Sequence, residues 1–98
     1  MGIRWRRRFP GSPKSDIREF LELFCDAFGF SRASRRHFSP DDRVVEVYRA
    51  LYPDRFMADA LELETLESRL WQRYGVEMRG FWREDITFAD VYSHTKMA

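Results

Sequence analysis

The sequence has 98 residues, of which 44% are hydrophobic, 34% charged and 16% aromatic, and its net charge is +1. This length suits one domain, the aromatic content favours a packed core over disorder, and no apolar run reaches the roughly 18 residues of a membrane-spanning helix. The one cysteine, Cys25, excludes an intramolecular disulfide, and the opening residues lack a signal-peptide pattern, so we expect a cytoplasmic protein.

Residues 1–14 are predicted to form a flexible basic arm ahead of a helical domain at 15–98. The arm carries five basic side chains and no acid, whereas the rest of the chain has a net charge of −4. One hypothesis is that the arm contacts phosphate groups through Arg4, Arg6, Arg7 and Arg8. Trp5 or Phe9 would then stack on bases or insert at a membrane surface. The alternative is an ordinary flexible terminus, or one that folds back on the acidic domain.

A first helix is predicted to run to about Phe28, with Ser15 or Asp16 as its N-cap. Its apolar side chains recur at spacings of three and four and form one stripe, namely Ile17, Phe20, Leu21, Phe24 and Phe28. Gly29 follows as a C-terminal stop. Cys25 lies beside the stripe, and we expect a buried apolar filler rather than a nucleophile, because no histidine is near it in sequence.

The polar and basic residues 30–38 are predicted to form a loop. This loop contains His37, and the other histidine, His94, is far away in sequence. Neither histidine has a metal-binding pattern of Cys, His or carboxylate residues at short range, so we expect no metal site.

A second helix is predicted over 40–52. Ser39 offers a hydroxyl cap, Pro40 takes the first helical position, and two acids follow in the first turn. Its apolar stripe consists of Val44, Val47 or Tyr48, and Leu51. Because the run from Val44 to Val47 is rich in β-branched residues, a strand remains the alternative.

The strongest helix pattern runs from Asp59 to Tyr74. Asp59 suits an N-cap, Glu62 has capping-box spacing to it, and Gly75 ends the helix. The core stripe is Leu63, Leu66, Leu70 and Tyr74. The opposite face presents Leu61, Thr65, Ser68 and Gln72.

Residues 76–86 show no clear period, although two aromatic residues in them are expected to cover the core, Phe81 and Trp82. A last short helix is predicted to begin at Thr87, because Thr87 and Asp90 have the spacing of a capping box. Beyond Tyr92 we expect the chain to fray.

Three motifs occur in order in the second half of the chain: Asp59-Ala60-Leu61-Glu62, then Gly75-Val76-Glu77-Met78, then Ile86-Thr87. In their order and spacing they resemble the acyl and peptidyl carrier proteins, in which similar motifs open the second helix, follow it and open the last helix. The resemblance covers roughly 38–92. It implies a small all-α, acyl-carrier-like bundle of three to four helices, with the residues around 40–52 as an extra helical insertion.

Ala60 stands where carriers hold the serine that is joined to 4′-phosphopantetheine. Alanine has no oxygen nucleophile, so the resemblance implies no cofactor here unless residue 60 is serine in a parent protein. Two interpretations stay open. Either a natural carrier-like protein lost or never had the attachment site, or Ala60 replaces the serine of a functional acyl carrier protein by engineering.

We expect a non-catalytic domain that acts by protein-protein binding, because the sequence has no paired acid and base, glycine-rich phosphate loop or cysteine-histidine arrangement. The resemblance implies a protein partner, such as an enzyme of acyl or lipid metabolism. We hypothesise that the partner contacts Asp59, Leu61, Glu62 and Thr65, against the alternative of an ordinary solvated face. A nucleic-acid-binding module that uses the basic arm is a rival hypothesis, disfavoured because the rest of the chain is net acidic.

Overall fold

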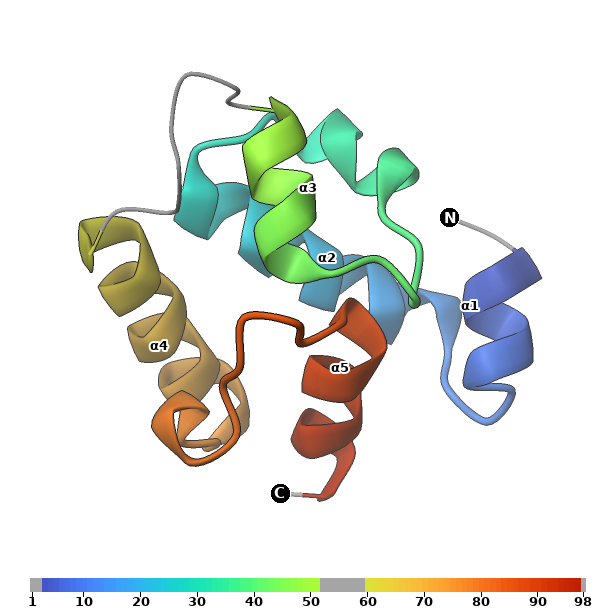
Figure 1. The fold of residues 1–98 in the computed structure, drawn as a ribbon. Helices are drawn as coiled ribbons and strands as arrows, with labels where there is room; N and C mark the ends of the chain where they lie inside the picture. The colour runs from blue at the N-terminus through green and yellow to red at the C-terminus, as the bar shows by residue number, and fades with distance from the viewer. Residues whose placement is uncertain (1–2, 52–59, 98) are drawn as a thin grey trace.

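The structure, a computed structural model, describes residues 3–51 and 60–97, and within these two segments it is all-α, as predicted. Its elements in chain order are α1 (Ile3–Arg8), α2 (Lys14–Phe28), the 3-10 helix η1 (Arg32–His37), α3 (Val44–Leu51), α4 (Ala60–Tyr74), the 3-10 helix η2 (Met78–Gly80) and α5 (Phe88–Met97). Among the α-helices of these segments, α1 is the one that falls outside the predicted bundle and its helical insertion. Helix α2 crosses the middle of the molecule, α3, α4 and α5 surround it, and α1 lies at one end (Figure 1). No helix in the described segments is long and apolar enough to cross a membrane.

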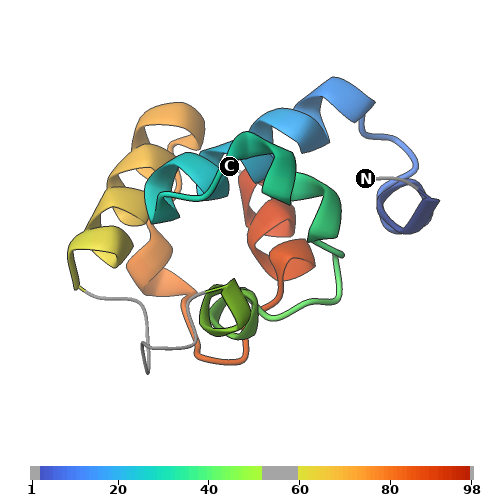
Figure 2. The same ribbon diagram turned by 90° about the horizontal axis from the view of Figure 1, so that it is seen from above.

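The core forms on the predicted apolar face of α2, whose five stripe residues are all buried. Phe20 packs edge to face on Tyr92 of α5, and Phe24 packs in the same way on Phe88. The ring centroids are 5.0 Å apart in both pairs. Leu66 and Leu70 of α4 are fully buried against this cluster, as the α4 stripe predicted. Figure 2 shows the helices arranged around this shared interior.

Both glycines that were predicted to end helices adopt the left-handed conformation, with φ of 77° at Gly29 and 69° at Gly75. Glycine has no Cβ and adopts this backbone conformation without steric strain, whereas other residues are strained in it. This explains why both helices end at glycine. At its other end α2 begins at Lys14 after Pro13, without a side-chain cap. The expected cap at Ser15 or Asp16 is therefore wrong.

The predicted flexible arm is instead partly helical and packed on the core. Trp5 of α1 is only 2% exposed, and its indole N–H donates to the Phe38 carbonyl at 2.9 Å. Phe9 packs edge to face on Tyr92 at 4.7 Å. A helix of six residues does not persist in water by itself, so these aromatic contacts stabilise α1. Trp5 is therefore not available for stacking on bases or for insertion into a membrane.

The predicted helix over 40–52 begins later than expected, at Val44. Instead of a first helical turn, the Asp42 carboxylate accepts a hydrogen bond from the Ser39 amide at 2.9 Å. The carbonyl of Pro40 accepts from the Ala89 amide at 2.9 Å. These residues adopt a turn because their backbone bonds to α5. The predicted loop at 30–38 similarly contains a short helical element, η1.

The last helix begins as predicted, because the Thr87 and Asp90 side chains each accept a hydrogen bond from the other residue's amide, at 3.1 and 3.2 Å. Fraying beyond Tyr92 is wrong, since α5 continues to Met97. The Thr95 hydroxyl donates to the Tyr92 carbonyl at 2.6 Å. The His94 ring also stacks on Phe81 with a centroid distance of 4.1 Å.

Candidate functional site

The predicted partner face falls around Ala60, the first described residue of α4. Asp59 lies outside the described residues, and so do the side chains of Leu61 and Glu62. The fourth residue of the face, Thr65, is half-buried. The structure thus places the backbone of Ala60, Leu61 and Glu62 in the first described turn of α4, while the side-chain surface of this face stays a prediction.

Farther along α4, the indole of Trp71 is 56% exposed. Beside it lies a groove of about 450 Å³ with buried apolar residues in its floor, lined by Glu67, Trp71, Val76, Glu77, Met78 and Arg79. The Arg79 guanidinium pairs with the Glu67 carboxylate at 3.0 Å along the rim. Sequence reasoning missed this groove. The sequence feature that could have revealed the groove was Trp71, a large apolar residue on the outer side of a predicted helix.

A second groove of about 400 Å³ separates α2 from α4 and is lined mainly by charged side chains, namely Glu19, Glu22, Leu23, Asp26, Arg32, Arg69, Gln72 and Arg73. Arg73 of α4 pairs with Glu19 of α2, and Arg32 pairs with Asp26 at 3.1 Å. These pairs are solvent-exposed and individually weak. Their geometric effect is to cross-link α2 to α4 and to η1.

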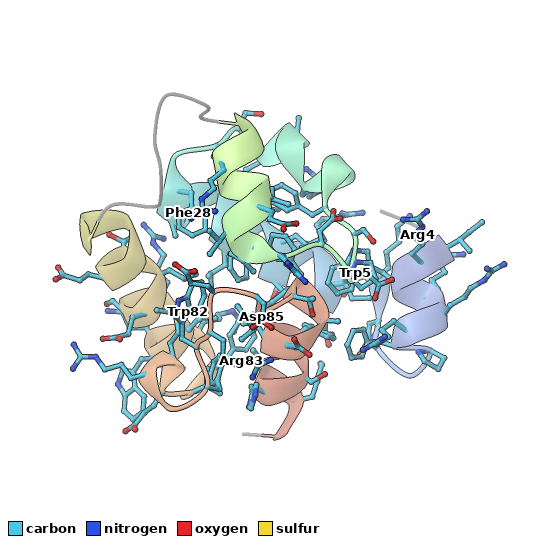
Figure 3. All side chains as sticks on the ribbon, in the orientation of Figure 1. Arg4, Trp5, Phe28, Trp82, Arg83 and Asp85 are labelled. Atoms are coloured by element: carbon cyan, nitrogen blue, oxygen red, sulfur yellow. The ribbon has the colours of Figure 1, made fainter. Side chains whose placement is uncertain are left out.

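The four predicted phosphate-contacting residues are brought together on α1, and all are exposed: Arg4, Arg6, Arg7 and Arg8. Arg8 lies 3.6 Å from the carboxylate of Asp41. Ile3 of the same helix is 65% exposed. Figure 3 shows the Trp5 side chain on the side of α1 that faces the rest of the molecule, with Arg4 near the N-terminal end of the helix.

Two groups, the Cys25 thiol and the Tyr74 hydroxyl, hold their protons more tightly than usual. Burial raises the pKa of the Cys25 thiol to about 11, so the nucleophilic thiolate is disfavoured, in agreement with the expected apolar filler. Burial likewise raises the pKa of the Tyr74 hydroxyl to about 12. Among the described residues, no three His, Cys, Asp or Glu side chains converge as a metal site would require.

Comparisons with known proteins found no match: neither a family model, nor a curated protein, nor a solved structure matches the chain. The resemblance to carrier proteins therefore depends on the order and spacing of the three motifs. Function is inferred from that order and from the surfaces that α1 and α4 present.

Proposed function

We propose that the protein is a non-catalytic, acyl carrier protein-like domain that lacks the phosphopantetheine attachment serine and acts by binding a protein partner. The partner is proposed to be an enzyme of acyl or lipid metabolism, and no cofactor is required. A cytoplasmic setting is part of the proposal, because the buried Cys25 thiol has no cysteine with which to form a disulfide.

The observation that carries the proposal is that Ala60 is helical and is the first described residue of α4. In carriers the modified serine lies at this helix start, where the positive end of the helix favours an incoming phosphate. The elements that follow keep the order expected from the motifs. Gly75 ends α4, Met78 opens η2 with a buried side chain, and Thr87 caps α5.

An Ala60→Ser variant tests whether the site is a recently lost attachment site. The variant is incubated with coenzyme A and a promiscuous phosphopantetheinyl transferase, and its intact mass is measured. We expect no gain in mass. A protein that acts without phosphopantetheine is not under selection to keep the surface that the transferase recognises. Addition of one phosphopantetheine would instead support the alternative of a functional acyl carrier protein whose serine was changed. The parent chain and a known carrier are the negative and positive controls.

The partner face is tested separately by the double variant Leu61→Ser/Glu62→Gln. We expect it to lose proteins that co-purify with the parent chain, since it removes the apolar anchor and one steering carboxylate. Glu84→Gln, an exposed site in the segment before α5, is the charge-matched control and should retain them. Retention of every partner by the double variant would mean that the face is ordinary solvated surface.

A further inference from the structure

We propose that α1 is a docking surface for an anionic lipid bilayer, on which Ile3 and Arg7 face outward and Arg4 and Arg6 lie exposed on either side of them. This surface is distinct from the partner face on α4, and its proposed role does not depend on the carrier resemblance. The lipid phosphate groups would be bound by the guanidinium groups, while the isoleucine enters the headgroup layer.

The outward direction follows from the burial of Trp5, which fixes the inward side of α1. At about 100° per residue, Ile3 and Arg7 then point within about 20° of the opposite direction, and Arg4 and Arg6 flank them. Arg8 is paired with Asp41. The other three arginines have no ion-pair partner among residues 3–51 and 60–97, so their charge is available to an external anion.

The anchoring of α1 is what makes these charges an organised surface. The Trp5 indole is tied to the Phe38 carbonyl and packs edge to face on Phe20 and Tyr92, at 6.4 and 6.0 Å. Phe9 secures the other end of the helix through its own contact with Tyr92. Because the helix is already ordered, binding does not have to meet the entropic cost of folding a flexible arm.

A bilayer suits this surface better than a nucleic acid or a protein does. The headgroup layer of a bilayer can take up an exposed apolar side chain beside arginines, whereas a phosphate backbone offers nothing to Ile3. The aromatic ring best placed in sequence to stack on bases, Trp5, is buried. A six-residue helix is also small beside the roughly 800 Å² that each partner buries in a stable protein complex.

The position of α1 in the molecule permits contact with a flat surface. Helix α1 lies at the opposite end of the molecule from α4 in both views (Figures 1 and 2). The longest dimension of the molecule is 37 Å, several times the Debye length of about 8 Å at physiological ionic strength. Acidic residues on the far side would therefore repel an anionic bilayer only weakly.

The test is co-sedimentation of the full chain with phosphatidylcholine vesicles containing about 30% phosphatidylserine, with pure phosphatidylcholine vesicles as the neutral comparison. The variant Arg4→Gln/Arg6→Gln/Arg7→Gln keeps good helix formers in α1. Each arginine near an anionic leaflet contributes roughly fivefold, so we expect the partition coefficient to fall by about 100-fold. The control Arg69→Gln/Arg79→Gln/Arg83→Gln removes the same net charge elsewhere and should stay within about threefold of the parent chain.

Substitution of Ile3 distinguishes binding to a bilayer from binding to other anionic ligands. Ile3→Ser should lower vesicle binding by about fivefold or more, because it removes the buried apolar group. Circular dichroism verifies that each variant keeps its helices. Absence of parent-chain binding to anionic vesicles would overturn the proposal. So would binding to duplex DNA that depends on the three arginines, exceeds vesicle binding at equal salt, and is unaffected by Ile3→Ser.

Discussion

Val44 and Phe88, the first residues of α3 and α5, each donate their amide N–H to the segment that precedes the other's helix. The Val44 amide bonds to the Ile86 carbonyl at 3.0 Å, and the Phe88 amide bonds to the Asp42 carbonyl at 3.1 Å. Arg43 and Thr87 lie between these bonds as an antiparallel bridge. The first amides of a helix have no partner within the helix. This reciprocal pair of bonds gives the first amide of each of the two helices an acceptor. It also ties two segments that are far apart in sequence.

This bridge should be visible in amide hydrogen exchange. We expect the amides of Val44 and Phe88 to exchange at least about tenfold more slowly than an unpaired amide at a helix start. Ser15, near the start of α2, is the internal comparison, because its amide has no partner among the described residues. Exchange at Val44 and Phe88 as fast as at Ser15 would mean that the bridge opens freely in solution.

Trp5→Phe should destabilise the protein by about 1–3 kcal/mol, because it leaves the buried Phe38 carbonyl without its donor and removes part of a buried ring. Urea unfolding followed by circular dichroism measures the change. Trp71→Phe is the matched control at an exposed tryptophan and should cost no more than about 0.5 kcal/mol. Equal losses in the two variants would show that α1 is not anchored through Trp5.

Features that depend on neighbouring residues could be predicted from sequence, and those that depend on distant partners could not. The glycine ends of α2 and α4 and the Thr87-Asp90 cap each need only a few consecutive residues. The fold of α1 depends on a hydrogen bond from Trp5 to Phe38, across a separation of 33 residues. No local pattern in an arginine-rich segment signals that contact. The start of α3 was misplaced for the same reason, since its turn bonds to α5.

The candidate surfaces show the same division. Composition identified Arg4, Arg6, Arg7 and Arg8, but not that their helix is fixed by an inward-facing tryptophan. The order of the motifs predicted a partner face around Ala60. The contacts of Asp59, Leu61 and Glu62 with a partner stay predictions. The groove beside Trp71 was missed because it forms between α4 and the later residues Val76 to Arg79, whose path after Gly75 has no sequence period.

The backbone at Gly75 gives a further test of the helix end. Gly75→Ala should destabilise the protein by about 1 kcal/mol, because alanine is strained at a φ of 69°, although no atom lies close enough to clash. Thermal unfolding provides the measurement. Gly11→Ala is the control, since Gly11 has neither a positive φ nor a close neighbour, and it should be neutral or stabilising by up to about 1 kcal/mol. A neutral Gly75→Ala variant would contradict the left-handed helix end.

Stability should fall at alkaline pH. Burial raises the pKa of the Cys25 thiol from its ordinary 9.0 to about 11, and that of the Tyr74 hydroxyl from 10.0 to about 12. Between the two values of each group, the unfolded chain has lost a proton that the folded chain still holds. The unfolded state then binds fewer protons, so the free energy of unfolding decreases as pH rises. The stability that depends on the protonated Cys25 thiol is fully present below pH 9 and is lost as the pH rises from 9 to about 11.

Urea unfolding at a series of pH values, with Cys25→Ala and Tyr74→Phe, separates the two groups. Cys25→Ala lowers stability at neutral pH by truncating a buried side chain, but the decrease that begins at pH 9 should become shallower, since the variant has no thiol to ionise. Tyr74→Phe should leave that first decrease intact and flatten the curve only above pH 10. If the parent chain and Cys25→Ala lost stability in parallel from pH 9 upward, the thiol would be ionising in the folded protein near its ordinary pKa of 9.0, which is incompatible with its burial in the core.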